Sequence, residues 1–150
     1  MVRMVAEMGE IRVDVTLSNA VDEGIARRGG MSMEEVRQDT VEAIVDTGAV
    51  RSCIPAALAQ KLGLEVTERM SVELADGNSQ VVGLTEPIRF QLLDRSTTEQ
   101  AWVLGNEVLI GQTVLETTDL LADCGNQRLI PNPEHPDGPV LKVKSVIGGL

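Results

Sequence analysis

The sequence predicts a mainly β domain with two short helices, and three observations lead to this fold class. Apolar residues recur at every second position over much of the chain, which is the period of a half-buried strand. Turn residues separate these segments at short intervals. The chain has 150 residues, of which 43% are hydrophobic and 24% charged, and this composition is typical of one globular domain.

The first part of the chain is predicted to contain two strands separated by a long excursion. In Glu10–Leu17, four aliphatic residues alternate with polar ones, and this is the clearest strand. Residues 18–40 lose the pattern and indicate a long hairpin or surface excursion, with a short helical turn at Met33–Arg37. Thr40–Val45 returns to strand and runs into the turn Asp46-Thr47-Gly48-Ala49.

The middle of the chain is predicted to form a short helix and then a β-hairpin. Pro55–Leu62 is the helix, because proline suits the first helical position and Gly63 follows the last one. Apolar and polar residues alternate over Met70–Leu74, and Asp76-Gly77-Asn78 is typical of a hairpin turn. Gln80–Gly83 is the returning arm.

Further short strands follow before a second helix. They are Ile88–Leu92, Ala101–Leu104 and Val108–Ile110. Thr113 and Glu116 have the spacing of a capping box, in which each side chain accepts the other residue's free backbone N–H, so we expect a helix after Gly111.

The C-terminal part of the chain is predicted to be a hairpin and an extended tail. Leu120–Asp123 and Gln127–Ile130 flank a turn of small and polar residues. Several prolines follow from Pro131 onward and predict an extended tail, in which Val140–Val143 could pair as an edge strand. We therefore divide the chain into a domain over residues 1–130 and a tail over residues 131–150.

Composition argues against several classes of partner. The formal net charge of −10 disfavours nucleic acid and anionic membranes, since both select dense positive charge. The chain has no run of apolar residues long enough for a membrane helix. Phe90 and Trp102 are the two aromatic residues, too few for a platform that stacks bases. We expect neither a nucleic-acid nor a membrane partner.

The two cysteines and the single histidine offer weak alternatives for a site. Cys53, Cys124 and His135 lack the paired spacing of zinc ligands, and a Cys124/His135 nucleophile pair is equally weakly supported. We interpret Cys53 as a small buried apolar residue, Cys124 as a plain thiol in a turn and His135 as a solvated loop residue. We expect no metal, no cofactor and a reduced, cytoplasmic location.

The Asp46-Thr47-Gly48 turn is the strongest functional signal. It follows a β-branched strand end and precedes a helix closely, a context in which the chain resembles the retropepsin-like aspartic proteases. The resemblance rests on the sequence VEAIVDTGA (residues 41–49), the helix end at residues 61–64, the hairpin 70–83 and EVLIGQTVLE (residues 107–116). It covers residues 10–131 and implies a closed β-barrel of the retropepsin type with two short helices.

The resemblance also implies roles for individual residues. Asp46 would be catalytic, with Thr47, Gly48 and Ala49 supporting its loop: Thr47 would lock the loop against its symmetry mate, and Gly48 would let the backbone approach closely and donate an N–H. Ile110 and Gly111 would close the family's ψ-shaped motif. Ala75, Asp76, Gly77 and Asn78 would form the tip of a flap over the substrate, and this tip is more polar than the retroviral pattern.

One Asp-Thr-Gly in the sequence makes catalysis depend on a second copy of the chain. Aspartic proteolysis needs two carboxylates that share one proton across a bound water. An active enzyme would therefore be a two-fold homodimer that contributes Asp46 twice and cleaves peptide bonds. The alternative is a non-catalytic dimeric peptide-binding module on the same fold.

Overall fold

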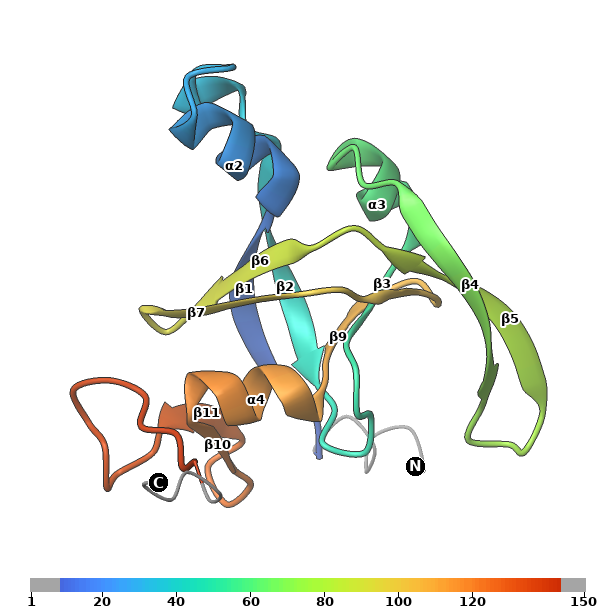
Figure 1. The fold of residues 1–150 in the computed structure, drawn as a ribbon. Coiled ribbons are helices and arrows are strands. Elements are labelled where there is room, and N and C mark those ends of the chain that lie inside the picture. Colours follow the sequence, from blue (N-terminus) through green and yellow to red (C-terminus); the bar gives the residue numbers. More distant parts are fainter. Residues whose placement is uncertain (1–8, 144–150) are drawn as a thin grey trace, which may run out of the picture.

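Nine strands form one curled sheet in the computed structural model, which describes residues 9–143 (Figure 1). Their order across the sheet is β4-β5-β8-β3-β9-β2-β1-β6-β7. They are β1 (Ile11–Asn19), β2 (Gln38–Val45), β3 (Cys53–Ile54), β4 (Val66–Glu73), β5 (Ser79–Thr85), β6 (Ile88–Leu92), β7 (Arg95–Glu99), β8 (Trp102–Val103) and β9 (Val108–Ile110). A separate hairpin consists of β10 (Leu120–Asp123) and β11 (Arg128–Pro131). The prediction of a mainly β fold is confirmed.

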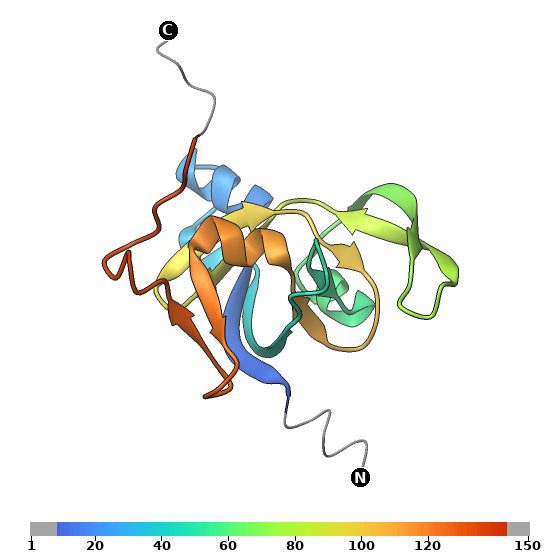
Figure 2. The ribbon, with the colours of Figure 1, turned by 90° about the horizontal axis from the view of Figure 1, so that it is seen from below.

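The sheet is open, and the predicted closed barrel is not formed. β4 and β7 are the two ends of the strand order, and within residues 9–143 they do not pair with each other. The β4–β5 hairpin joins the remaining strands through the two-residue strand β8, opposite Gly83 and Leu84. Because this connection is so short, the hairpin projects away from the body of the molecule (Figure 2). The result is a curled sheet that wraps around its core on one side.

Strand β1 lies inside the sheet, between β2 and β6, and follows the predicted alternation. It pairs antiparallel with both β2 and β6. Val15 and Leu17 are fully buried, while Arg12 lies exposed on the other face. β2 pairs in parallel with β9, with Val45 opposite Ile110. This parallel pair brings two segments that are far apart in the sequence to one end of the sheet.

Three short α-helices accompany the strands within residues 9–143, one more than predicted. The predicted helices are α3 (Ala56–Lys61) and α4 (Gln112–Thr118). The additional helix α2 (Ala20–Arg27) lies in the segment that we expected to be an excursion, which also contains the predicted short turn as the 3₁₀ helix η1 (Met33–Glu35). The Asn19 side chain caps α2 by accepting the Asp22 N–H at 3.0 Å. Because Asn19 is also the last residue of β1, the sequence indicated the end of a strand there and gave no separate signal for the start of a helix.

The start of α4 differs from the predicted capping box. Gly111 is the residue that precedes the helix, and it has no side chain to cap it. The Thr113 hydroxyl donates to the Glu99 carboxylate of β7, and the Thr113 N–H donates to the Val50 carbonyl at 3.0 Å. The predicted pair of Thr113 with Glu116 is therefore wrong, because a neighbouring loop already satisfies the free N–H groups.

Two strands of the sheet were not predicted. β3 has only two residues, which is too short to show an alternation. β7 has the polar sequence RSTTE and forms an edge of the sheet, where it pairs with β6 alone. Both strands are defined by their neighbours and not by an apolar pattern of their own.

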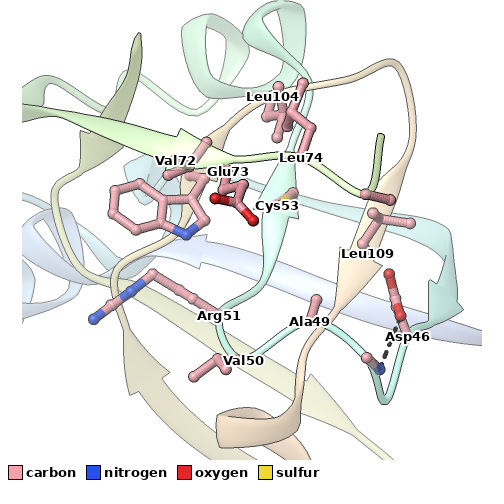
Figure 3. A pocket seen from close by; sticks show the side chains of 13 residues that line it. Asp46, Ala49, Val50, Arg51, Cys53, Val72, Glu73, Leu74, Leu104 and Leu109 are labelled. Atoms are coloured by element: carbon pink, nitrogen blue, oxygen red, sulfur yellow. Dashed lines mark hydrogen bonds between the residues drawn. The ribbon is translucent and has the colours of Figure 1, made fainter. Parts of the chain in front are cut away.

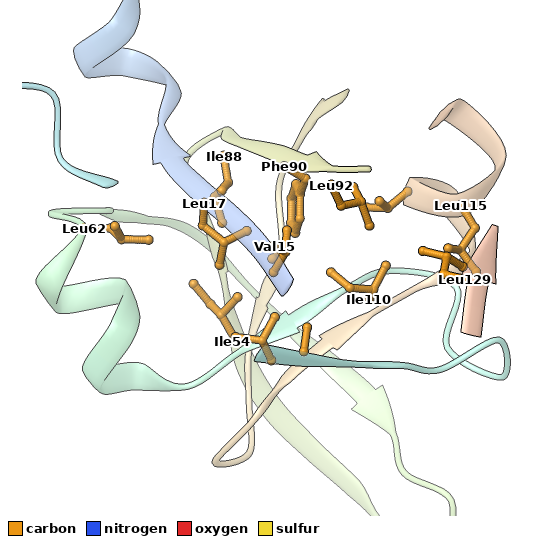
Figure 4. Packing of buried hydrophobic residues seen from close by; sticks show 14 of the residues in the cluster. Val15, Leu17, Ile54, Leu62, Ile88, Phe90, Leu92, Ile110, Leu115 and Leu129 are labelled. Atoms are coloured by element: carbon orange, nitrogen blue, oxygen red, sulfur yellow. The ribbon is translucent and has the colours of Figure 1, made fainter. Parts of the chain in front are cut away.

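The core fills the concave side of the sheet with aliphatic side chains (Figure 4). Phe90 is its only aromatic member and is fully buried. The buried side chains come from both halves of the chain and include Val15, Leu17, Ile54, Leu62, Ile88, Phe90, Leu92, Ile110, Val114, Leu115 and Leu129. This core fixes the ends of β2 and β9 relative to each other.

The chain after β11 contains turns at residues 133–134 and 136–137, one of them closed by the His135 N–H, which donates to the Asn132 carbonyl at 2.8 Å. It makes no strand over residues 132–143, so the possible edge strand at Val140–Val143 is not formed. His135 is not a solvated loop residue as predicted. Its Nδ1 lies 2.6 Å from Asp119 Oδ2, and its side chain is only 26% exposed. The division of the chain at residue 130 stays a prediction, and residues 1–8 and 144–150 of its two parts lie outside the described residues.

Candidate active site

Asp46 lies at the carboxyl end of β2, where this strand runs beside β9. Its backbone N–H donates to the Ile110 carbonyl at 2.9 Å, which extends the contact between the two strands by one residue. Its carboxylate Oδ1 accepts the Gly48 N–H at 3.0 Å, and within residues 9–143 it accepts no other hydrogen bond. The turn therefore orients the carboxylate and leaves its second oxygen available for a water or a partner.

A second segment crosses the turn and fixes it in place. The Gly111 N–H donates to Oγ of the fully buried Ser52 at 2.8 Å. The first two N–H groups of α4 donate to the carbonyls of Ala49 (2.7 Å) and Val50 (3.0 Å). A Cβ at Gly111 would lie 2.7 Å from the carbonyl carbon of Arg51, so only glycine fits this crossing. The structure thus brings the Asp-Thr-Gly turn and the Ile-Gly segment together.

A pocket of about 820 Å³ opens beside Asp46 (Figure 3). It lies between the Asp46 turn, β8 and the part of the β4–β5 hairpin next to the hairpin turn, Val72–Ala75. Most of its wall is apolar and is contributed by Val50, Val72, Leu74, Trp102, Leu104 and Leu109. An apolar cleft next to a weakly coordinated carboxylate is suited to binding a chain with apolar side chains.

The predicted flap residues divide between the pocket and the outer tip of the hairpin. Ala75 lines the pocket, whereas Asp76, Gly77 and Asn78 do not. Gly77 has a φ of 87°, which the turn requires. The Asp76 carboxylate accepts the backbone N–H (2.9 Å) and the side-chain Nδ2 (3.0 Å) of Asn78, and these bonds hold the pKa of Asp76 below its ordinary value. The polar tip is therefore stabilised by its own residues.

The remaining residues of the predicted loop face two different sides. Ala49 lines the pocket together with Asp46 and Gly48. Thr47 is exposed and lines a second hollow of about 400 Å³, which also involves α4 and the chain after β11. Its predicted contact with a symmetry mate stays a prediction.

The two cysteines occupy different environments. Cys53 is buried and lines the pocket, and both its burial and the nearby Asp46 charge raise the pKa of its thiol. A neutral, buried thiol fits the interpretation of Cys53 as a small apolar residue. Cys124 is exposed and free. Among residues 9–143, no three His, Cys, Asp or Glu side chains are grouped so that they could hold a metal ion.

Several residues that line the pocket were missed by the sequence analysis. Arg51 follows Asp46 by five residues, and Glu73 and Trp102 come from β4 and β8. No local pattern marks them, because the pocket arises only when the hairpin folds over the turn. Position in the sequence gave the one usable signal. Arg51 comes shortly after the Asp46–Ala49 turn, and Glu73 comes shortly before the predicted hairpin tip at Ala75–Asn78.

Comparison with known sequences agrees with the geometry of the site. Residues 34–117, more than half of the chain, match the profile of the family described as gag-polyprotein putative aspartyl protease. This segment contains Asp46, the β4–β5 hairpin and Gly111. No curated protein gives a significant match to the sequence. No helix within residues 9–143 has the length and apolar character to cross a membrane.

Solved structures that match this chain include a protease-like domain and two viral proteins. The retroviral protease-like domain of Ddi1 from Leishmania major matches with a TM-score of 0.54 and 19% identity, over 91% of this chain and 98% of that domain. The foamy viral protease-reverse transcriptase in complex with RNA/DNA hybrid matches with a TM-score of 0.46 and 15% identity, and the match covers 71% of this chain but only 12% of that one. Simian foamy virus protease gives a TM-score of 0.44 and 12% identity over 69% and 90% of the two chains.

Proposed function

We propose, because this chain belongs to the gag-polyprotein aspartyl protease family of retropepsin-like proteases, that it hydrolyses peptide bonds as a homodimer through Asp46 of each protomer. The observation that carries the proposal is the state of the Asp46 carboxylate. It ends a strand in a turn fixed by Gly111, faces a pocket of about 820 Å³ and accepts a hydrogen bond from Gly48 alone among the described residues. Family membership supports a protease function in general, and the assignment to Asp46 is our inference.

The proposed chemistry uses the two copies of Asp46 in different protonation states. One carboxylate is ionised and takes a proton from the bound water, which then attacks the scissile carbonyl carbon. The other is protonated and donates to the carbonyl oxygen, so that negative charge developing there is stabilised. When the C–N bond then breaks, the proton taken from the water passes to the leaving amine and the second carboxyl recovers its own proton. The Gly48 N–H, 3.0 Å from Oδ1, keeps the carboxylate oriented toward the pocket during this exchange.

The requirement for a dimer follows from the number of carboxylates. One chain supplies one Asp-Thr-Gly, so an isologous contact around a two-fold axis must supply the second. The Asp46 turn, the tip of the β4–β5 hairpin and the β10–β11 hairpin all lie on the lower side of the molecule in Figure 1. Exposed apolar residues occur on the same side, namely Leu121, Val140 and Leu141, which line the second hollow together with Thr47. This surface supports association with a second copy.

Solution mass tests the dimer. Light scattering at micromolar concentrations is expected to give about twice the mass of 16.1 kDa. A strict monomer at every concentration, with and without a peptide substrate, would count against the proposed catalysis.

Cleavage of a peptide library at about pH 4–6 tests the activity, and a statine-type inhibitor is expected to block it. Cleavage that persists in the presence of the inhibitor and in an Asp46→Asn variant would reject Asp46 as the catalytic group. Peptide binding without cleavage would instead indicate the dimeric binding module. The cytoplasmic location predicted from the two cysteines remains a proposal.

A further inference from the structure

The pocket beside Asp46 contains a cation that is held in a fixed position. The Arg51 guanidinium carbon lies 5.5 Å from the centroid of the Trp102 ring, within the range of a cation–π interaction. Arg51 Nη1 also donates to the Gln100 carbonyl at 3.3 Å. The contacts with Trp102 of β8 and with Gln100, two residues before this strand, therefore orient the side chain, and most of its N–H donors have no partner within residues 9–143.

Arg51 differs from four of the eight other arginines within residues 9–143 in having no carboxylate partner, and it differs from the remaining four in lining the pocket beside Asp46. Among the described residues, Arg12, Arg37, Arg89 and Arg128 each form an ion pair with a carboxylate. Arg51 forms none within residues 9–143, although it lines a pocket that contains two carboxylates. A fixed guanidinium without a carboxylate partner is suited to binding an acidic group in two-pronged geometry.

The other charges of the pocket are Asp46 and Glu73. Glu73 comes from β4 and lies on the hairpin side, across the pocket from Arg51 on the turn side (Figure 3). The rest of the wall is mainly apolar, so Arg51 is the one positive charge that a bound chain would meet there. The protein carries a formal net charge of −10, so acidic peptides have no general attraction to it. A preference for an acidic side chain would therefore have to arise locally.

We propose that Arg51 is a specificity-determining residue that binds the carboxylate of an Asp or Glu side chain of the substrate, close to the bond that Asp46 cleaves. The inference deepens the proposed function and rests on it for the identity of the ligand as a peptide. The apolar wall of the pocket binds the neighbouring side chains of the substrate. The Trp102 ring holds the Arg51 guanidinium in the position where it meets the acidic side chain of the substrate. Glu73 does not contact the acidic side chain in this arrangement, and its negative charge weakens binding slightly through like-charge repulsion.

Binding to a protein that cannot cleave tests the inference. Two pools of octapeptides would be titrated into the Asp46→Asn variant. Both pools are built from Ala, Leu, Val and Ser and have acetylated and amidated ends. One fixed position is Glu in the first pool and Gln in the second. Trp102 is the only tryptophan, so its fluorescence reports binding at this wall, and calorimetry gives an independent affinity. We expect the Glu pool to bind about tenfold more tightly than the Gln pool. Because the ends are blocked, only a side-chain carboxylate can produce this difference.

Variants of the charged residues decide the origin of the preference. Adding Arg51→Gln is expected to remove the difference between the pools, and Arg51→Glu to favour a matched Lys pool instead. Glu73→Gln is the control, because it changes a charge on the opposite wall and should leave the Glu preference intact or slightly larger. Equal binding of the two pools, absence of binding, or a preference that survives Arg51→Gln would overturn the inference.

Cleavage of the same pools by the unmodified protein separates this inference from the proposed function. Cleavage without any preference for Glu would overturn the role of Arg51 and leave the protease intact. A preference for Glu in binding, without cleavage at any pH, would overturn the protease and leave the role of Arg51 standing.

Discussion

Two aspartates of this chain, Asp46 and Asp119, end secondary-structure elements but have opposite surroundings. Asp46 follows β2 and accepts one hydrogen bond within the described residues, from Gly48. Asp119 follows α4 with a left-handed φ of 56° and accepts bonds from Asn132 Nδ2 (3.0 Å), His135 Nδ1 (2.6 Å) and the Val140 N–H (3.1 Å). The first faces an open pocket, and the second organises the chain after β11.

The difference distinguishes a carboxylate that holds structure from one that is available for chemistry. The bonds to Asp119, led by that from Asn132, lower its pKa to about 2, so that it is ionised at any ordinary pH. Its described partners occupy both carboxylate oxygens, so this group has little capacity left for a substrate. Asp46 has free acceptor sites in a pocket lined by apolar side chains, which is the condition that a water-activating carboxylate needs.

The largest expected effect comes from removing the charge of Asp46. Asparagine has nearly the same size and can still accept the Gly48 N–H, so the turn should form, but the side chain cannot take a proton from water. We expect Asp46→Asn to lower the cleavage rate by roughly 10³-fold or more, with the melting temperature unchanged or raised. Asp137→Asn, an equal change of charge at an exposed position, is the control and should leave both quantities unaltered.

The next effect concerns Gly111, on which both regions depend because it fixes the Asp46 turn and starts the helix that ends at Asp119. In Gly111→Ala the new methyl group would meet the backbone at Arg51 (2.7 Å) and Ser52 (2.8 Å), which cannot move aside without displacing the turn. We expect a loss of about 3 kcal/mol in the free energy of unfolding, measured by urea denaturation. In Gly125→Ala the nearest contact would be an ordinary 3.7 Å, so a loss of similar size there would contradict this account.

The sequence revealed the two aspartates to very different degrees. Asp46 was found because its turn is a local motif that follows a β-branched strand end, and because Pro55 and Gly63 mark the two ends of the helix after it. Asp119 was not found, because its partners Asn132, His135 and Val140 are brought to it only by the fold of the β10–β11 hairpin and the chain after it. His135 was accordingly predicted to be solvated, although it is bonded to Asp119.

The same distinction explains which elements of the fold were predictable. β1 and the β4–β5 hairpin show alternation or turn residues in their own sequences. Helix α2, in contrast, depends on contacts between distant residues: its Asp22 carboxylate binds the side chain of Arg37 at 2.8 Å. The short strand β3 and the polar edge strand β7 likewise depend on their neighbours. The open form of the sheet could not be read from any segment, because closure depends on how two edges meet.

A third prediction tests how firmly the Asp119 region is held. Arg95 of β7 is 7% exposed and donates to the carbonyls of Thr118 (3.0 Å), Asp119 (2.9 Å) and His135 (2.6 Å). Arg95→Met keeps most of the side-chain volume but leaves these carbonyls without their donor. We expect a loss of about 2–4 kcal/mol in the free energy of unfolding.

The matched control for Arg95 is Arg128→Met. Arg128 forms an exposed ion pair with Asp123 at 3.3 Å, and exposed pairs contribute about 0–1 kcal/mol. Equal losses in the two variants would show that Arg95 has no special role in attaching the chain after β11.

The smallest expected effect is a pH dependence that separates the two aspartates in one protein. Because the pKa of Asp119 is about 2 in the folded state and 3.8 ordinarily, the ionised carboxylate stabilises the fold fully above about pH 4. This contribution is lost as the pH falls from about 4 to about 2. In Asp119→Asn it is absent throughout, so the difference in urea midpoint between the two proteins should shrink as the pH falls from about 4 to about 2.

Proteolysis by the Asp46 pair is expected to change at higher pH, since one of the two facing carboxylates must be protonated and activity should be highest on the acid side of neutrality. A rate that falls between pH 6 and 8 while the midpoints do not move would assign the loss of activity to the catalytic pair. A rate that rises continuously through pH 8 would contradict the shared proton and point to a mechanism that does not use Asp46.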